Sequence, residues 1–352
     1  MKSILVTGGA GFIGSHTSLE LIHKGYRLVL IDNFDNSSAE SIERIKYISS
    51  LDNINVKDNF EFNFGDIKDE NFLEYVFNKS KIHNKEIKGV MHFAGVKSVS
   101  ESVKNPIKYW DQNLKGTISL LTIMNKFNCR NLVFSSSATI YGLKNQSPLS
   151  ENKSCFPVNP YGETKITIEK MLKNIYDSDP KSWNILNLRY FNPIGAHSSG
   201  LIGETSKAES ENLFPVLCEV ASNKREELQI YGNDWPTKDG TCIRDYIHVS
   251  DIASGHLKAI EFLLSSKGVF YSINLGTGIP TSVLELLKIF EKVNKVKINF
   301  TYSNRRKGDV PILYADVGFA KKILGWNASR NIEEMCIDGW KWYLYRKKYS
   351  NK

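Results

Sequence analysis

The sequence predicts an α/β protein with a doubly wound parallel sheet and a second, smaller α/β domain. Two observations favour this class. Along the first half of the chain, short runs rich in β-branched residues alternate with longer polar or amphipathic segments. The first run also passes directly into a glycine-rich turn and a helical segment, in the stretch ILVTGGAGFIGSH. Strands that alternate with helices pair in parallel through right-handed crossovers, so we expect one open sheet.

Six strands are expected in chain order, and each is followed by a polar or amphipathic segment. They occupy residues 2–9, 26–33, 60–66, 88–95, 131–138 and 183–192. Open parallel sheets bind ligands beyond the carboxyl ends of their strands, so functional residues should lie just after these runs. Beyond residue 190 the alternation loosens into a Gly/Ser/Glu-rich stretch, 197–215, which we expect to be a substrate loop.

The turn after the first strand carries Gly8, Gly11 and Gly14 at three-residue spacing. Because glycine has no Cβ, the backbone of such a turn can approach a pyrophosphate at the positive N-terminus of the next helix, which begins with Phe12 and Ile13. This is the Rossmann pattern for dinucleotides. We therefore expect residues 1–189 to bind a dinucleotide and residues 190–352 mainly to bind the substrate, with the chain crossing between the two domains.

The second strand ends at Asp32, which is followed by Asn33. A carboxylate there would accept hydrogen bonds from the adenosine ribose hydroxyls and would repel a 2′-phosphate, which favours NAD over NADP. The structural alternative is that Asp32 only begins a turn. Two further strand ends are expected to contact the cofactor, through Asp66 with Ile67 and through Phe93 with Ala94 and Gly95.

Composition and charge argue against several other classes. With 41% hydrophobic and 24% charged residues, no apolar run long enough to cross a bilayer and no signal-peptide pattern, the chain is typical of a cytoplasmic globular protein. The five cysteines include no Cys-x-x-Cys pair and the seven histidines form no cluster, so neither a disulfide framework nor a metal site is predicted. The net charge of +8 comes without a nucleic-acid-binding motif and suits an anionic metabolite.

A phenol and an amine stand four residues apart in PYGETK, residues 160–165, at the head of a predicted helix. On a helix they share one face, and a cation beside a phenol favours the phenolate, which can take a proton from an alcohol. We predict that Tyr161 is this base and that Lys165 lowers its pKa and holds the nicotinamide ribose. Ser137, at the end of the strand 131–138, would orient the substrate oxygen. The alternatives are an ordinary helix start and a serine that only caps a strand end.

Motifs along nearly the whole chain make the sequence resemble the extended short-chain dehydrogenase/reductase family and, within it, the UDP-glucose 4-epimerases. The motifs are TGGAGFIGSH, IDN, FAG with Lys97 behind it, NLKGT, SSSATIYG, YGETK, RYFNPIGAH, GTCIRDYIHV, NLGTG and RRKGD. The resemblance implies an isomerase that keeps NAD bound, oxidises C4 of a UDP-hexose to a transient ketone, and returns the hydride to the other face. It also implies a homodimer.

The resemblance places further residues at binding positions. For the cofactor these are Asn36, Lys97, Asn113, Tyr190 and Phe191, the last two flanking the nicotinamide. For the UDP portion they are Asn192, Asn212, Leu213, Tyr231, Arg244, Arg306 and Asp309. Paired arginine donors suit a pyrophosphate, although Arg244 could instead form a surface ion pair with Asp245 or Asp251.

One departure from the family pattern concerns substrate choice. Leu313 falls where the resemblance places a residue that decides whether a 2-acetamido group fits, and enzymes restricted to glucose and galactose often have tyrosine there. Because leucine is smaller, we expect UDP-N-acetylglucosamine and UDP-N-acetylgalactosamine to be accepted beside UDP-glucose and UDP-galactose.

Three alternatives stay open at this point. A nucleotide-sugar 4,6-dehydratase would need an acid after Ser137, where the chain has Ala138 and Thr139. A reductase or dehydrogenase with an exchangeable cofactor would use the same three side chains. A non-catalytic UDP-sugar-binding protein of the same fold would not need them.

Overall fold

The computed structural model describes residues 1–54, 56–205, 212–306 and 308–350. Its centre is a seven-stranded sheet in the order β11-β6-β5-β4-β1-β2-β3, and every pairing in it is parallel. The strands are β1 (Ser3–Thr7), β2 (Arg27–Asp32), β3 (Phe60–Phe64), β4 (Ile87–His92), β5 (Asn131–Ser137), β6 (Asn184–Tyr190) and β11 (Val269–Leu275). All six expected strands are present, and the order reverses between β1 and β4, as in a doubly wound sheet.

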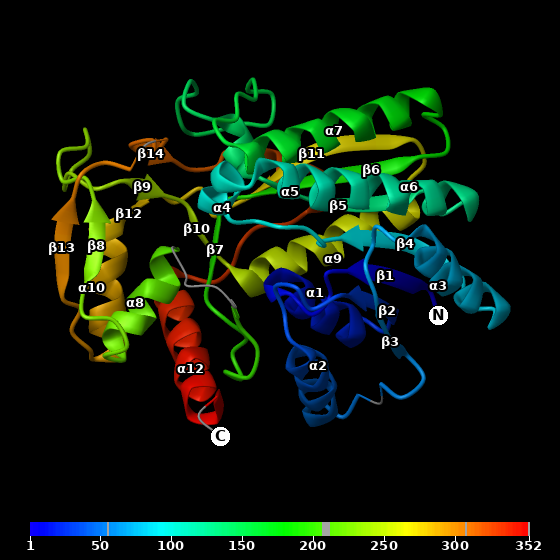
Figure 1. Cartoon of the computed structure of the whole chain (residues 1–352), viewed down its shortest axis with the longest axis horizontal. Coiled ribbons are helices and arrows are strands. Elements are labelled where there is room, and N and C mark those ends of the chain that lie inside the picture. Colours follow the sequence, from blue (N-terminus) through cyan, green and yellow to red (C-terminus); the bar gives the residue numbers. More distant parts are fainter. Residues whose placement is uncertain (55, 206–211, 307, 351–352) are drawn as a thin grey trace.

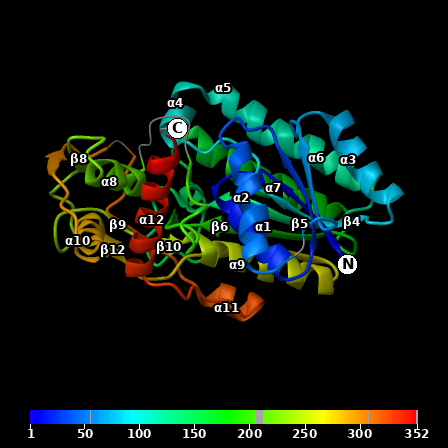
Figure 2. The same ribbon diagram turned by 90° about the horizontal axis from the view of Figure 1, so that it is seen from below.

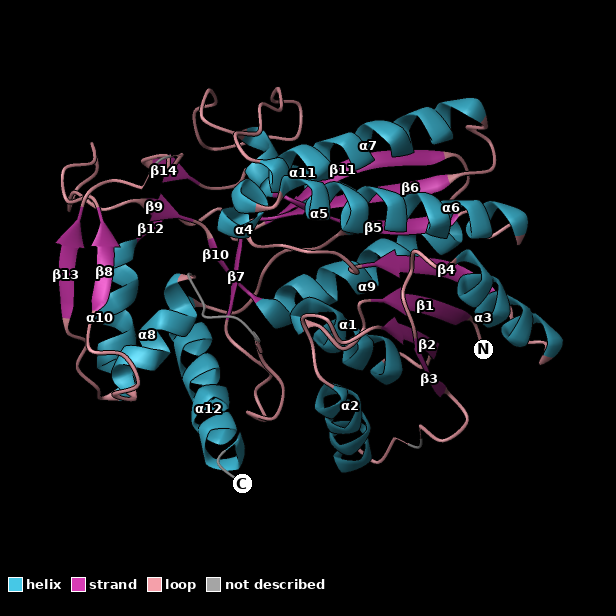
Figure 3. Ribbon diagram, viewed as in Figure 1, coloured by secondary structure: helices cyan, strands magenta, loops and turns pink. Residues whose placement is uncertain are grey.

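Helices cover both faces of this sheet (Figures 1 and 3). On one face lie α1 (Phe12–His23), α2 (Ala39–Leu51), α9 (Val249–Ser265) and α11 (Gly318–Leu324). On the other lie α3 (Glu70–Ile82), α6 (Gly116–Lys126) and α7 (Pro160–Ser178). Side chains alternate along a strand, so Ile4 and Val6 of β1 pack into the first of these cores and Leu5 into the second.

The second half of the chain returns to the sheet. Strand β11 pairs with β6 at the sheet edge, and α9 packs against α1 beneath the sheet (Figure 2). Most of residues 244–263 forms the long helix α9.

A smaller group of elements lies beside the sheet, at the left of Figure 1. Helices α8 (Leu213–Ala221), α10 (Val283–Asn294) and α12 (Ile332–Ser350) pack with β8 (Leu228–Tyr231) around a separate apolar core. Strand β13 (Phe300–Ser303) pairs with β8, and the remaining short strands are β7 (Asn192–Ile194), β9 (Ile243–Arg244), β10 (Tyr246–His248), β12 (Thr281–Ser282) and β14 (Ile312–Leu313).

Short helical segments follow strands β4 and β5 of the sheet. They are α4 (Val99–Lys104), α5 (Pro106–Tyr109), the π-helical turn η1 (Trp110–Lys115) and the 3₁₀ turn η2 (Ala138–Tyr141). The expected substrate loop is described over residues 197–205, and residues 206–211 lie outside the described residues. Among the helices that the structure describes, none combines the length and apolar character required to cross a membrane.

Candidate active site

A groove of about 430 Å³ runs along the carboxyl ends of the strands, on both sides of the point between β1 and β4 where the strand order reverses. Most of the predicted cofactor residues line it. They are Gly8, Gly11, Phe12, Ile13, Gly14, Asp32, Asn33, Asn36, Asp66, Ile67, Phe93, Ala94, Gly95, Lys97, Tyr161, Lys165, Tyr190 and Phe191. The structure therefore gathers strand-end residues far apart in sequence around one concave surface.

The N-terminus of α1 opens toward this groove without a side-chain cap. Gly11 is its N-cap residue and offers no side-chain hydrogen bond, and the first turn contains no acid. Close packing leaves no room for a side chain at Gly14, where a Cβ would lie 2.2 Å from the carbonyl oxygen of Gly8. The first-turn N–H groups and the positive end of the helix dipole are thus available to an anion such as a pyrophosphate.

Asp32 ends β2 and is almost fully buried. One carboxylate oxygen accepts a 2.9 Å hydrogen bond from the N–H of Ala10 in the glycine turn. The other accepts bonds from the N–H of Phe34 at 2.9 Å and from the hydroxyl of Ser37 at 2.7 Å. Asp32 therefore fixes the glycine turn against the turn after β2, in addition to facing the groove.

Asn113 is the one predicted cofactor residue that is absent from the groove lining, where its neighbour Gln112 appears. Its side chain instead accepts from the N–H of Val96 at 2.8 Å and donates to the hydroxyl of Thr164 at 3.0 Å. It belongs to the π-helical turn η1, a feature often found beside functional sites. Asn113 thus joins the loop after β4 to α7, next to Lys165.

Tyr161 and Lys165 occupy the first turns of α7, which begins at Pro160 with Asn159 as its cap. Lys165 donates a 2.7 Å hydrogen bond from Nζ to the carbonyl oxygen of Ser135, and its Nζ lies 5.8 Å from the centroid of the Tyr161 ring. Ser137, at the end of β5, accepts from the hydroxyl of Thr139 at 3.0 Å. All three predicted catalytic side chains line the groove.

The electrostatics differ from the expectation that Lys165 lowers the pKa of Tyr161. Burial raises the pKa of Tyr161 to about 12, and a hydrogen bond with Ser137 acts in the opposite direction. Burial also lowers the pKa of Lys165 to about 8, which nearby Glu169 partly offsets. For both groups, removal from water is the largest cause of the pKa shift.

A buried ion pair lies one turn further along α7. Glu169 accepts hydrogen bonds from Arg189 of β6, at 3.1 Å from Nε and at 2.7 Å from a terminal nitrogen. The same carboxylate accepts from the hydroxyls of Ser136 at 2.5 Å and Ser272 at 3.2 Å. Because these partners come from β5, β6 and β11, the carboxylate fixes the catalytic helix against three neighbouring strands.

The predicted substrate residues fall into two groups. Asn192, Asn212 and Leu213 line the groove. The second group lies on the smaller set of elements, where the Arg306 guanidinium is 4.2 Å from the Tyr231 ring and Arg244 pairs with Asp309 at 3.6 Å.

The surface ion pair considered for Arg244 is not the arrangement found. The carboxylate of Asp245 accepts from Thr277, Gly278 and Ala315, and that of Asp251 pairs with Arg330. Leu313 pairs with Arg244 across β14 and β9 and packs in the cluster that contains Phe191.

Sequence reasoning missed several residues of the groove. Thr139, Glu204, Thr205 and Tyr246 line it. Thr139 lies in the 3₁₀ turn η2 and Tyr246 in the short strand β10, both within the motifs given above, whereas Glu204 and Thr205 lie on the loop after β7 beyond any motif.

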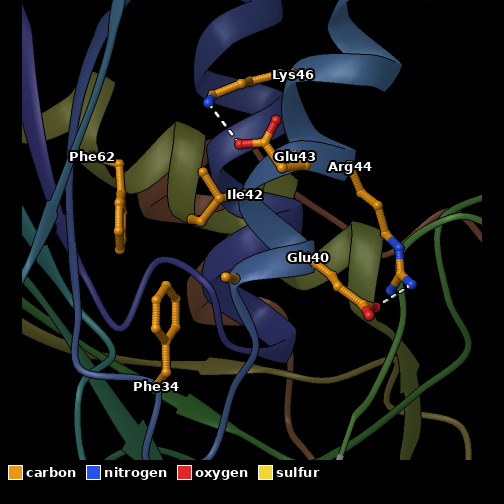
Figure 4. Close-up of a pocket in the computed structure, with 8 residues that line it drawn as sticks. Phe34, Glu40, Ile42, Glu43, Arg44, Lys46 and Phe62 are labelled. Atoms are coloured by element: carbon orange, nitrogen blue, oxygen red, sulfur yellow. Dashed lines mark hydrogen bonds and ion pairs between the residues drawn. The ribbon is translucent and has the colours of Figure 1, made fainter. Parts of the chain in front are cut away.

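A second pocket, of about 500 Å³, lies between α2 and the sheet edge (Figure 4). Phe34 and Phe62 stack on one another at one side of it, with ring centroids 5.3 Å apart. The charged side chains at its rim pair among themselves, Glu40 with Arg44 and Glu43 with Lys46 at 2.8 Å. It presents no arrangement of groups that points to catalysis.

Comparisons with known proteins add independent findings. The family model described as GDP-mannose 4,6 dehydratase matches residues 5–338. A UDP-glucose 4-epimerase from Bacillus subtilis is 47% identical over 340 residues, which are 97% of this chain and 96% of that protein. A bifunctional UDP-glucose 4-epimerase and UDP-xylose 4-epimerase from Pisum sativum is 46% identical over 342 residues, 97% of this chain and 95% of that protein.

A solved structure is similar over almost the whole length. It is a UDP-glucose 4-epimerase from Stenotrophomonas maltophila with bound NAD and formylated UDP-arabinopyranose, with a TM-score of 0.93, 40% identity and 99% of each chain covered. The similarity thus extends over both the sheet and the smaller group of elements.

Proposed function

This chain belongs to the UDP-glucose 4-epimerase family, and we propose that it interconverts UDP-glucose and UDP-galactose by NAD-dependent epimerisation at C4. The observation that carries the proposal is the position of Tyr161, Lys165 and Ser137. They lie together at the end of β5, in the same groove as an uncapped helix N-terminus and the acid of β2. An acid–base group and a dinucleotide site in one groove suit hydride exchange with a carbinol.

The wider family model carries the name of a dehydratase, yet the residues after Ser137 favour epimerisation. Loss of water from C5 and C6 needs an acid beside the tyrosine, and Ala138 and Thr139 stand there. Thr139 donates a hydrogen bond from its hydroxyl to Ser137, and an aliphatic hydroxyl is too weak an acid to replace a carboxylic acid in this role. We therefore infer an epimerase within the dehydratase-like family.

The residues of the groove fit NAD. The glycine turn has the close packing that a pyrophosphate site needs, and Asp32 would disfavour a 2′-phosphate. Bound NAD supplies reversible acceptance of hydride and, in its oxidised form, a positive charge. That charge matters because burial raises the pKa of Tyr161 to about 12, so a second cation beside Lys165 would favour the phenolate.

Each side chain has a defined task in this proposal. Tyr161 takes the proton of the C4 hydroxyl and later returns it, and Ser137 orients that oxygen. Lys165, held by the Ser135 carbonyl, is placed to hold the nicotinamide ribose. The sugar becomes a transient 4-keto species, and the sugar ring must rotate so that its other face is reduced. The UDP portion anchors it meanwhile, so its binding energy keeps the intermediate in the site.

We propose that residues 1–189 hold the cofactor and that residues 190–352 mainly bind the UDP-sugar, with the chain crossing between the two domains. Arg244 and Arg306 would neutralise the diphosphate. In the present arrangement Arg244 pairs with Asp309, and the guanidinium of Arg306 lies over Tyr231. In the proposal, phosphate oxygens of the substrate would replace these contacts with other protein groups.

Acceptance of N-acetylated UDP-hexoses is the finer part of the proposal. Leu313 packs in the apolar cluster with Ala138, Ile140 and Phe191, close to where β5 delivers Ser137. A leucine there leaves volume that a tyrosine would fill. UDP-xylose is a second candidate substrate, favoured by the bifunctional relative from Pisum sativum.

We also propose that the chain forms a homodimer in the cytoplasm. Residues 106–126 are almost continuously helical, and Ile107, Trp110 and Ile118 recur along them with exposed fractions of 81%, 37% and 45%. Val103 on the neighbouring α4 is 63% exposed. Such a row of apolar side chains suits a second copy of the same surface. All five cysteines are free thiols, which suits a reducing compartment.

The direct test is incubation of the purified protein with UDP-galactose and no added cofactor, followed by separation of the products. The proposal expects UDP-glucose to accumulate to equilibrium and NAD to be released on denaturation. Parallel reactions with UDP-xylose and the N-acetylated pair define the substrate range. A parent protein that holds NAD yet leaves UDP-galactose unchanged would contradict the proposed activity.

A further inference from the structure

An ion pair bridges the rim of the cofactor groove. Lys97, on the loop after β4, donates a 2.7 Å hydrogen bond from Nζ to Oε1 of Glu204, on the loop after β7. Both residues line the groove. The Lys97 ammonium also lies 5.9 Å from the ring centroid of Phe12, the first residue of α1. The pair therefore joins two loops beside the helix end that suits a pyrophosphate.

The loop that carries Glu204, residues 195–205, is anchored in the cofactor-binding half, and we name it the cofactor strap. Ile202 is 2% exposed and packs in the core formed by the sheet with α1 and α9. The strap is also closed on itself, by a 2.9 Å hydrogen bond from the N–H of His197 to the carbonyl of Ile202 and by a bridge between Ala196 and Gly203. Glu204 thus projects from a fixed support.

Helix α12 supports the strap from its outer side. Trp342, which is 4% exposed, donates a 3.0 Å hydrogen bond from Nε1 to the backbone carbonyl of Glu204. The packing is tight, since a Cβ at Gly203 would lie 2.3 Å from Cδ1 of Trp342. The Arg44 guanidinium lies 4.9 Å from the Trp342 ring, and Figure 4 shows Arg44 extending away from the α2 pocket. Trp342 therefore links the strap to α2.

We propose that Glu204 is a positioning residue that closes the cofactor groove through Lys97 and slows release of the bound dinucleotide. The proposal rests on the proposed epimerase function, in which the hydride must return to the same sugar. A cofactor that leaves in its reduced form would strand the 4-keto sugar, so slow release has a direct chemical purpose. Lys97 is 57% exposed in the pair and Glu204 only 17%, so the fixed partner is the carboxylate.

A closing role and simple charge repulsion predict opposite changes in the rate of NAD release when Glu204 is neutralised. The dinucleotide is an anion, so a glutamate without a closing role would repel it, and neutralising that glutamate would slow release. If Glu204 instead holds Lys97 across the groove, neutralising it frees the lysine and opens the rim, and release becomes faster.

The experiment measures how fast labelled NAD leaves the purified holoenzyme into an excess of unlabelled NAD, by rapid gel filtration at successive times. The Glu204→Gln variant keeps the shape of the side chain and removes its charge. For this partly exposed pair we expect release about three- to fivefold faster at low ionic strength. The difference should shrink at about 0.5 M salt, because screening weakens the pair in the parent.

A matched control distinguishes the loss of a charge at the groove rim from the loss of a surface charge elsewhere. Glu74 pairs with Lys126 at 2.7 Å on the helices α3 and α6, away from the groove lining. Glu74→Gln should release NAD at the parental rate. Equal release from the parent and Glu204→Gln, or slower release from Glu204→Gln, would overturn the proposal.

A second variant tests the support without changing any charge. Trp342→Phe removes the hydrogen bond to the Glu204 carbonyl, and we expect release about twofold faster. Trp340→Phe is its control on the same helix, where Trp340 packs against Phe290 and Tyr343 instead. If Trp342→Phe releases NAD at the parental rate, α12 does not contribute to closing the groove.

Two outcomes distinguish the closing role of Glu204 from the proposed epimerase activity. A parent that epimerises and retains NAD, while Glu204→Gln exchanges it no faster, overturns the closing role alone. A parent that neither retains NAD nor epimerises overturns the proposed function and the closing role together.

Discussion

The Lys165 ammonium donates a 2.7 Å hydrogen bond to the backbone carbonyl of Ser135. This contact ties the first turns of the catalytic helix α7 to the end of β5, two residues before Ser137. Lys165 does not control the pKa of Tyr161 on its own, because burial of the phenol dominates and raises that pKa to about 12. Tyr161 of α7 and Ser137 of β5 thus face the same groove, and Lys165 fixes the two elements against one another.

Replacement of Tyr161 by phenylalanine tests the acid–base role. The aromatic ring is kept, and only the hydroxyl that moves the proton is lost. We expect the rate of epimerisation to fall about 10²- to 10⁴-fold, with the NAD content of the purified protein unchanged. Product separation after incubation with UDP-galactose gives the rate, and absorbance after denaturation gives the bound NAD. If this variant kept the parental rate of epimerisation, another group would have to transfer the proton of the C4 hydroxyl.

Removing the carboxylate charge from Glu169 should destabilise the whole sheet-facing side of α7. Glu169→Gln leaves the guanidinium of Arg189 buried without a counter-charge, and breaking a buried pair typically costs about 3–5 kcal/mol of unfolding free energy. Glu74→Gln, which breaks an exposed pair, should change it by less than about 1 kcal/mol. Urea unfolding followed by circular dichroism measures both, and equal effects would show that burial does not decide the outcome.

The sequence was sufficient where local pattern and fold agree. The six strands, the glycine turn with its helix, and the Tyr161 and Lys165 pair are each marked by short-range spacing, and the structure brings their residues to one edge of the sheet. The residues that sequence reasoning missed depend on long-range packing. Glu204 faces Lys97 across 107 positions of chain, and no local rule reports such a pairing. Nor could a motif show that Asn113 bonds Val96 and Thr164.

Leu313→Tyr tests how the site selects its sugar. A larger side chain in the cluster with Phe191 should lower kcat/KM for UDP-N-acetylgalactosamine about tenfold or more relative to UDP-galactose. Leu313→Met keeps the volume and should leave the ratio close to that of the parent. Initial rates with both substrates decide it, and undetectable turnover of the acetylated pair by the parent would end this part of the proposal.

Ile107→Glu tests the proposed dimer surface. The side chain is 81% exposed, so the monomer should fold normally, whereas a charge in a self-complementary apolar contact should weaken association at least about tenfold. Ile82→Glu is a matched control, since Ile82 is 77% exposed at the end of α3. Light scattering over a range of concentrations gives the mass of each variant. A parent that is monomeric throughout would contradict the dimer.

Three buried histidines predict the pH dependence of stability. Burial lowers the pKa of His16 and His92 to about 3 and that of His256 to about 4, from their usual 6.5. Between these values and 6.5 the unfolded chain binds protons that the folded chain excludes, so stability rises with pH in this window and falls as pH drops below 6.5. Each histidine contributes a slope of up to about 1.4 kcal/mol per pH unit.

His92→Gln should reduce this slope by one histidine's share, because a glutamine cannot gain the proton in the unfolded chain. Its amide can still hydrogen-bond Thr7 and Thr117, the two present partners of the imidazole at 2.8 and 3.0 Å, so the fold should be kept. His83→Gln, at an exposed position after α3, is the matched control for the substitution itself. Urea unfolding free energies at several pH values between 5 and 7.5 measure the slope. An equal slope of unfolding free energy against pH in the parent and His92→Gln would mean that His92 is protonated in the folded chain as readily as in the unfolded chain.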